Sequence, residues 1–199
     1  YVRVKDKPLT YADWIEGIAK GSTVVSRNAH DEFLEFVVND SIGPGQEIRL
    51  KGKGTVQAEI KWSAAKKLTG RVELICNGKV VASKSGTVDA GAPLILKTSQ
   101  DFTRSGWLCA RRMSQEGYQV HASAVFVTVD DAPVRASAED ALFFVRWIDN
   151  ILEKTTPGGE WNRYFTHDLN VVRDRYNKAR EIYLKISEEA RNIEDGAVK

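Results

Sequence analysis

The chain has 199 residues, of which 42% are hydrophobic and 28% charged, a composition typical of a folded globular protein rather than an intrinsically disordered one. Its net charge is only +2, and the basic residues are spread along the chain, so we expect no nucleic-acid partner. No apolar run reaches the roughly 20 residues that a membrane-spanning helix needs, and we expect no membrane partner. The chain begins at Tyr1 without a methionine, which leads us to expect a processed chain or a fragment.

Residues 1–21 predict a short strand followed by a short helix. Apolar and charged residues alternate over the first four positions, a pattern that favours a strand. Thr10 with Asp13 three residues later forms a capping box. Trp14 and Ile18 then lie on one apolar face of the predicted helix.

The region from Gln46 to Val129 has the pattern of an antiparallel β-sandwich. Short apolar segments repeat every 8–12 residues or so, after two further apolar runs at 23–25 and 33–38 that also predict strands. Asn77-Gly78 predicts a type I′ hairpin turn. About seven strands without a helix among them indicate an Ig-like sandwich, whose core receives every second residue of the strands, including Val56, Ala58, Ile60, Trp62, Val72, Leu74 and Cys76.

Beyond Pro133 the apolar residues recur with a helical period. Ser137, with Asp140 three residues later, predicts the start of a buried helix that Pro157 ends. A second, longer helix carries a heptad seam with charged residues on its other side. We expect the two helices to form an antiparallel hairpin, with the seam packed on the partner helix or, alternatively, on another chain. The seam comprises Phe165, Leu169, Val172, Tyr176, Ala179, Tyr183, Ile186, Ala190 and Ile193.

The cysteines and histidines give no complete catalytic or metal-binding motif. Cys76 and Cys109 lie in strand-like runs, where they are either two buried free thiols or a disulfide across the sandwich. His121 and His167 have no second ligand at a metal-binding spacing, and structural roles are expected for both. His30 differs, because it lies in a loop crowded with polar groups that could bind an anion or a metal-bound ligand, or could simply be solvated.

No phosphate-binding loop or nucleophile elbow is present, and the paired acids Asp130-Asp131 and Glu188-Glu189 predict a turn and a solvated helix face. Arg111-Arg112 follows Trp107 on a predicted strand. These residues leave open either an anion or carbohydrate patch, or ordinary exposure of one side of the strand.

Several segments of the chain match the pattern of a known family: the opening strand, the segment Pro-Leu-Thr-Tyr-Ala-Asp-Trp with the helix that follows it, and the strand that ends at Arg27-Asn28. The matching segments are residues 1–4, 8–21, 23–28, 38–39, 43–45, 72–81, 105–111 and 144–149. With these segments the chain resembles, over essentially its whole length, the C-terminal region of the CehA/McbA family of PHP-type metallohydrolases. In that family the metal ligands lie in an N-terminal barrel, so the resemblance implies zinc or manganese in a barrel absent from this chain and no cofactor here. Arg27, Asn28 and His30 correspond to a turn at the barrel mouth, although Ala29 and His30 replace the family's Gly-Pro.

We therefore expect an α+β chain in three parts: a strand–helix remnant of a catalytic region (1–38), an Ig-like antiparallel β-sandwich (39–133) and a C-terminal two-helix hairpin (134–199). The first hypothesis for its function is a non-catalytic accessory region that borders the catalytic barrel of a divalent-metal hydrolase acting on phosphoester-like bonds. The resemblance also suggests export. Because the barrel that would cover them is absent, the opening strand and helix are expected to pack on the sandwich, to pair between chains or to fray. Trp14 and Ile18 are the apolar side chains expected to be exposed.

The alternative hypothesis is an independent carbohydrate- or protein-binding β-sandwich module. Its binding face would contain Trp62, Arg111, Arg112 and Tyr118, because exposed aromatic and arginine side chains are frequent in binding surfaces. Either the helix that carries Trp14 or the C-terminal helix could also join copies of the chain into a homo-oligomer.

Overall fold

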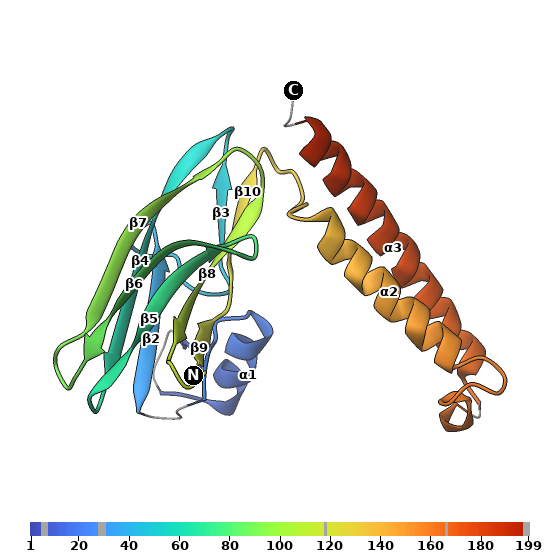
Figure 1. Cartoon of the computed structure of the whole chain (residues 1–199), viewed down its shortest axis with the longest axis horizontal. Coiled ribbons are helices and arrows are strands. Elements are labelled where there is room, and N and C mark those ends of the chain that lie inside the picture. The colour runs from blue at the N-terminus through green and yellow to red at the C-terminus, as the bar shows by residue number, and fades with distance from the viewer. Residues whose placement is uncertain (5–7, 28–30, 118, 166, 197–199) are drawn as a thin grey trace. The chain divides into compact units, whose positions relative to one another are not determined.

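The computed structural model describes residues 1–4, 8–27, 31–117, 119–165 and 167–196. Its elements divide into two compact units, Tyr1–Val134 and Arg135–Lys199, shown in Figure 1. The first unit contains α1 (Tyr11–Ala19), β1 (Val24–Ser26), β2 (Glu32–Val38), β3 (Glu47–Leu50), β4 (Gly54–Ala64), β5 (Leu68–Cys76), β6 (Lys79–Val88), β7 (Leu94–Phe102), β8 (Gly106–Met113), β9 (Gln119–Ala122) and β10 (Val125–Val129). The second contains α2 (Ala138–Lys154), the 3₁₀ turn η1 (Asn162–Tyr164) and α3 (Leu169–Gly196).

The first unit is a sandwich of two sheets, as expected. Over the described residues, the larger sheet has seven strands, in the order β1-β9-β8-β10-β3 with β5 and β6 paired beside β8, and the smaller has three, β2-β4-β7. Strand pairing is antiparallel except between β10 and β3, which run parallel. The α+β fold class, with an Ig-like sandwich and a helical hairpin, is confirmed.

Alternation along the strands places the core between the two sheets. On β4, Val56, Ala58, Ile60 and Trp62 are buried, and on β5 Val72 and Leu74 are fully buried. Apolar side chains on alternate residues thus leave water together, which is the main source of favourable free energy in a sandwich. The Asn77-Gly78 turn has the positive φ angles, 47° and 84°, that a type I′ hairpin requires.

The boundary predicted at residue 38 differs from the observed division of the chain. Strand β1 pairs with β9 in the larger sheet, and β2 pairs with β4 over its whole length in the smaller one. Strands β1 and β2 are therefore part of the sandwich and not a separate remnant. The prediction went wrong because the short strand β1 gains its partner from almost a hundred residues further along the chain, which local pattern does not reveal.

The segment from Gln119 to Val129 contains two strands, β9 and β10, rather than one continuous strand. Both strands pair with β8, but their registers differ by one residue. Arg111 pairs with His121, and Leu108, three residues earlier on β8, pairs with Val125, which is four residues after His121. This extra residue is a β-bulge. It changes which residues face the core, from Val120 and Ala122 before the bulge to Val125 and Val127 after it.

Cys76 and Cys109 are free and buried. Cys76 belongs to the core between the sheets. Cys109 is paired with Ile75 on the neighbouring strand and points to the outer face of the larger sheet, because its neighbours Leu108 and Ala110 point inward. The two thiols lie on opposite faces of one sheet, which explains why they form no disulfide.

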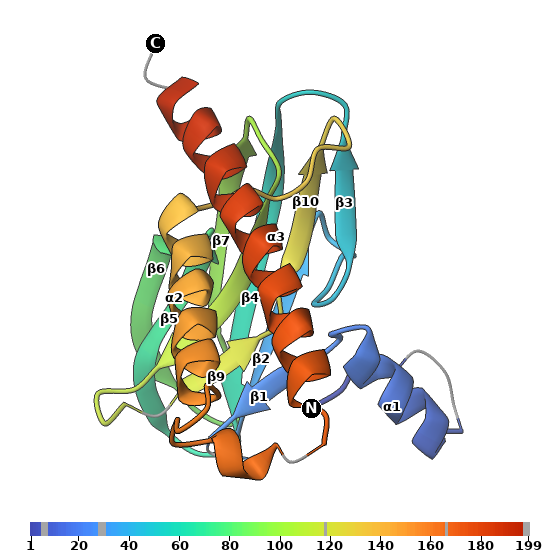
Figure 2. The same ribbon diagram turned by 90° about the vertical axis from the view of Figure 1, so that its right-hand side faces the viewer.

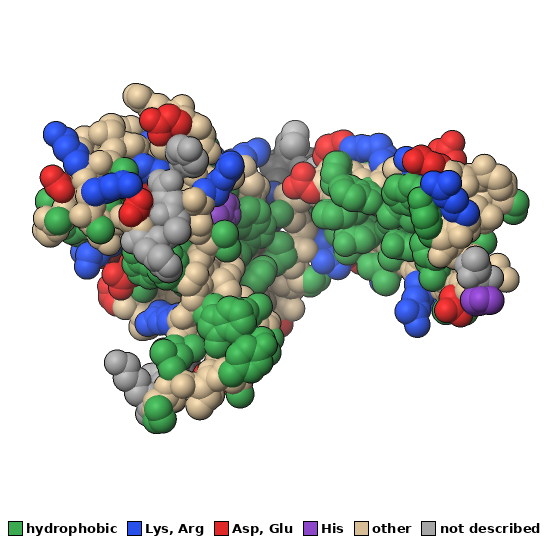
Figure 3. Space-filling model, turned by 90° about the horizontal axis from the view of Figure 1, so that it is seen from below, with side chains coloured by type: hydrophobic (Ala, Val, Ile, Leu, Met, Phe, Trp, Pro, Cys, Tyr) green, Lys and Arg blue, Asp and Glu red, His purple; other side chains and the backbone are tan. Residues whose placement is uncertain are grey.

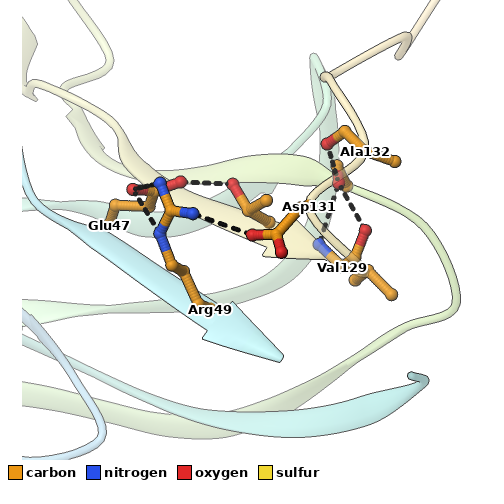
Figure 4. A network of polar contacts seen from close by, with 7 residues as sticks. Glu47, Arg49, Val129, Asp131 and Ala132 are labelled. Carbon is orange, nitrogen blue, oxygen red and sulfur yellow. Dashed lines mark hydrogen bonds and ion pairs between the residues drawn. The ribbon is translucent and has the colours of Figure 1, made fainter. Parts of the chain in front are cut away.

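A polar network holds the end of the sandwich together (Figure 4). Arg49 on β3 donates to Asp131 at 2.8 Å and pairs with Glu47 at 3.0 Å. Nearby, the buried hydroxyl of Ser105 donates to the Ala132 carbonyl at 2.6 Å and accepts from the Val129 amide at 2.8 Å. Ser105 thus provides hydrogen-bond partners for the backbone carbonyl and amide groups where the chain leaves the last strand, β10.

We predict that Ser105→Ala destabilises the sandwich by about 1–3 kcal/mol, because it leaves the buried Val129 amide without its acceptor. Urea unfolding followed by near-UV circular dichroism measures the effect. Ser85→Ala on β6, where the side chain is exposed, is the matched control and should change stability by less than about 0.5 kcal/mol. Equal effects of the two substitutions would contradict this role of Ser105.

The second unit is an antiparallel helical hairpin, in which α2 and α3 lie side by side (Figure 2). Ser137 caps α2 as expected, by accepting from the Asp140 amide. Phe144 stacks on Tyr183 with ring centroids 4.9 Å apart, and Arg180 forms an ion pair with Asp149 at 2.6 Å. The predicted seam from Leu169 to Ala190 forms the partly or fully buried side of α3, while its last residue, Ile193, is exposed. Phe165, predicted to be its first residue, lies before α3, which begins at Leu169. Among the described residues, no helix has the length and apolar character needed to cross a membrane.

Candidate functional site

Two of the four residues predicted to form an exposed binding face, Trp62 and Arg112, are buried, so this prediction is wrong for them. Arg112 follows the inward-facing Leu108 and Ala110 on β8 at intervals of two and therefore points into the core. Its guanidinium lies over the Trp62 ring, 4.5 Å from the centroid. The aromatic and arginine side chains do meet, but inside the sandwich.

Glu32 completes this buried cluster. One carboxylate oxygen accepts from the Trp62 indole N–H at 2.8 Å, and the other accepts from the Arg112 guanidinium at 3.2 Å. Burial lowers the pKa of Arg112, while the nearby charges of Glu32 and Glu116 oppose that shift. The cluster joins β2, β4 and β8 across both sheets, and we assign it a structural role.

Arg111, the third predicted residue, lies on the outer face of the larger sheet and is partly exposed. Its guanidinium donates to Glu73 at 2.6 and 2.8 Å, and Arg71 donates to the same carboxylate at 2.7 Å. Arg111 is therefore engaged in an ion pair with its neighbours. The fourth predicted residue, Tyr118, lies outside the described residues.

The loop predicted to lie at the rim of an active site is only partly described. The Arg27 amide donates to the Gln119 carbonyl at 3.2 Å, which fixes the end of β1 beside β9. Asn28 and His30 lie outside the described residues. His121 and His167 are exposed, and within the described part of the chain no three His, Cys, Asp or Glu side chains are placed to hold a metal ion together.

The helix α1 exposes most of its apolar side. Its capping box is formed as predicted, with Thr10 accepting from the Asp13 amide, yet the one residue of this helix that is buried is Gly17. Trp14 is 44% exposed and Ile18 43% exposed. The expectation that these two side chains are exposed is therefore confirmed.

The apolar surface extends from α1 onto the larger sheet. Ile18 and Val25 line one shallow hollow, and Val25 also lines the next one together with Trp107 and Phe126. Val25 is 66% exposed. We call this area the α1–sheet surface and define it by Trp14, Ile15, Ile18, Val25, Trp107 and Phe126. Hydrophobic side chains gather on the sandwich unit in Figure 3.

This surface is suited to binding a protein. Continuous exposed apolar area with large aromatic residues is characteristic of interfaces, and it contains two hollows into which a partner could insert side chains. The sequence predicted Trp14 and Ile18 from helical periodicity. It did not identify Val25 and Phe126, because their exposure depends on which face of each strand turns away from the smaller sheet.

The sequence matches no protein-family model and no curated protein. Among solved structures, it is similar to the CARDB domain of a Pyrococcus furiosus protein, with a TM-score of 0.32, 13% identity, and coverage of 50% of this chain and 97% of that one. It is also similar to fibronectin(III)-like modules of Clostridium thermocellum CbhA, with a TM-score of 0.32, 14% identity, and coverage of 50% of this chain and 99% of that one. At these scores the fold class rests on the chain's own strand pairing.

Proposed function

We propose that the chain is a non-catalytic interaction module, a β-sandwich that binds a folded protein domain through the α1–sheet surface. The observation that carries the proposal is the exposed apolar side of α1. A helix whose own unit covers little more than Gly17 gains stability when a partner removes Trp14 and Ile18 from water. A carbohydrate site on the face predicted from sequence has lost its basis, because Trp62 and Arg112 belong to the core.

We propose further that the partner is the catalytic barrel of a divalent-metal hydrolase. The resemblance to the CehA/McbA family supports this proposal, because in that family the segment similar to residues 1–28 directly follows the last metal-binding motif of the barrel. The exposed side of α1 then has a specific occupant. Any zinc or manganese would be held by barrel residues, and this chain would supply the contact surface.

The class of activity is tested by hydrolysis of phosphodiester and carboxylester chromogenic substrates with added zinc or manganese. The 199-residue chain alone is expected to be inactive, and a parent protein that includes the barrel is expected to be active. Turnover by the short chain would refute the proposal of a non-catalytic module. Inactivity of both would refute the hydrolase assignment and leave the interaction module to be judged by the binding experiment.

We predict that Trp14→Lys and Ile18→Lys weaken the association with the barrel at least about 30-fold each, because large apolar side chains at the centre of an interface typically contribute 2 kcal/mol or more. The same substitutions should change the stability of the isolated chain by less than about 0.5 kcal/mol, because both side chains are largely exposed there. Calorimetric titration of the separately produced barrel measures the first effect, and urea unfolding measures the second.

Val81→Lys is the matched control. Val81 is 44% exposed, as Trp14 is, but it lies on β6, away from the α1–sheet surface. It should leave the association unchanged. If Val81→Lys weakened binding as much as Trp14→Lys, or if the α1 variants had no effect, a docking role for this surface would be excluded.

A further inference from the structure

A thiol and an imidazole from neighbouring strands meet on the outer face of the larger sheet. Cys109 Sγ on β8 lies 4.0 Å from His121 Nε2 on β9. The β-bulge that separates β9 from β10 directly follows this place, between the pairs Arg111↔His121 and Leu108↔Val125. Bulges are frequently found where a side chain is directed to a functional position.

The hydrogen bonding of His121 leaves its Nε2 able to act as a ligand. Its Nδ1 lies 2.9 Å from the carbonyl oxygen of Ala122. A carbonyl oxygen only accepts, so Nδ1 must carry the proton and donate it. In the neutral ring Nε2 then holds a free electron pair, which points toward the sulfur of Cys109. A backbone carbonyl that fixes the tautomer in this way is one of the usual outer partners of a metal-binding histidine.

The surroundings of the pair are apolar and open on one side. Cys109 and His121 line a shallow pocket of about 380 Å³ with Trp107 and Phe126. The sulfur is buried, whereas the imidazole is exposed, so an ion can approach from solvent along the ring. Burial raises the pKa of Cys109 to about 11, against a smaller opposing effect of Arg111. The group is therefore a thiol at neutral pH and a poor nucleophile.

We propose that Cys109 and His121 form a binding site for a soft monovalent cation, for which Cu(I) is the representative. Thiolate and imidazole are ligands that Cu(I) prefers. With metal–sulfur and metal–nitrogen bonds of about 2.3 and 2.0 Å, an ion joined to both atoms at their present separation has a ligand–metal–ligand angle of about 135°. That angle suits an ion of low coordination number.

The number of ligands disfavours zinc, which takes three or four protein ligands in its tetrahedral sites. Within the described residues, no third His, Cys, Asp or Glu joins this pair. Binding of Cu(I) exchanges the thiol proton for the metal: the S–H bond breaks, S–Cu and N–Cu bonds form, and one proton passes to the buffer. The metal keeps its oxidation state.

The test is an anaerobic titration of the full chain with Cu(I) in competition with a chromogenic Cu(I) chelator. We expect one tightly bound ion per chain, with release of about one proton, measured as the dependence of the binding enthalpy on the buffer's ionisation enthalpy. Cys109→Ala and His121→Gln should each weaken binding by more than the roughly 10–100-fold loss that follows removal of an outer-shell partner. Near-UV circular dichroism checks that the variants remain folded, and His121→Gln alters an exposed side chain.

Cys76→Ala is the matched control, because it removes the chain's other thiol, which lies in the core behind the same sheet. It should leave the affinity unchanged. The proposal is overturned if wild-type protein does not compete with the chelator, if His121→Gln binds as tightly as wild type, or if Cys76→Ala weakens binding as much as Cys109→Ala does. The pair lines the same hollow as Val25, Trp107 and Phe126 of the α1–sheet surface, so the titration is done on the chain without a protein partner. The two proposals have separate readouts, and either can fail without the other.

Discussion

Glu32→Gln is expected to destabilise the sandwich by about 3–5 kcal/mol, the usual cost of leaving one charge of a buried ion pair without its partner. Glu32 accepts from both the Trp62 indole N–H and the Arg112 guanidinium. A glutamine offers one acceptor and one N–H₂ group, so one of these two donors must face another donor. Arg112 would then remain charged and buried, with its Nε already lacking a partner. Urea unfolding monitored by tryptophan fluorescence measures the loss.

A matched control is available on the same strand. Glu35 lies 3.8 Å from Lys61, and both side chains are about half exposed, so Glu35→Gln should cost at most about 1 kcal/mol. The double variant Glu32→Leu/Arg112→Met provides a second comparison, because it removes both charges together. It should be more stable than either corresponding single variant. A small effect of Glu32→Gln would show that the cluster is more hydrated than its burial indicates.

Features set by local pattern were predictable from the sequence. The alternation Val56, Ala58, Ile60, Trp62 identified the core strand β4, and Asn77-Gly78 identified the turn between β5 and β6, because period-2 burial and positive φ depend on nearby residues alone. The capping residues Thr10 and Ser137 were correct for the same reason. These signals depend on residues close together in the sequence.

Features set by distant pairing were not predictable. Arginine is usually found at the surface, and the burial of Arg112 depends on its partner Glu32, 80 residues away in the sequence. The assignment of β1 and β2 to the sandwich likewise required knowledge of β9 and β4 as partners. At the candidate site, the sequence identified Trp14 and Ile18 but not Val25, whose outward direction is fixed by pairing with His121.

The glycines in Gly43-Pro44-Gly45 illustrate a further limit. Glycine and proline together are typical of a turn, and Gly45 does have a left-handed φ of 81°. The structure adds a close approach: a Cβ at this position would lie 2.1 Å from the Lys20 carbonyl oxygen and 2.6 Å from the Gly21 carbonyl carbon. The amide of Gly45 also donates to the Ala124 carbonyl at 2.8 Å. Gly45 therefore lies between the end of α1 and the bulge after β9.

We predict that Gly45→Ala destabilises the sandwich unit by about 2–4 kcal/mol, through backbone strain at positive φ and displacement of tightly packed backbone. The loss should be concentrated at the end of α1, where the amides of Ser22 and Arg3 donate to the carbonyls of Gly17 and Ser22. Hydrogen exchange resolved by residue is the measurement. Protection of these amides should fall more than protection in the central strands β4 and β8.

Gly91→Ala separates the two causes. Gly91 has almost the same φ, 79°, but no atom lies within 4 Å of its ideal Cβ position, so the substitution imposes the strain of a left-handed residue, about 1–2 kcal/mol, without the collision. The difference between the two variants then measures how tightly the end of α1 is held against the sandwich. A substantial difference indicates that α1 is a fixed part of the unit, as an interaction surface requires. If the two variants were equally stable, the end of α1 would move away from the added methyl group at little cost in free energy. The α1–sheet surface would then have to form when the partner binds.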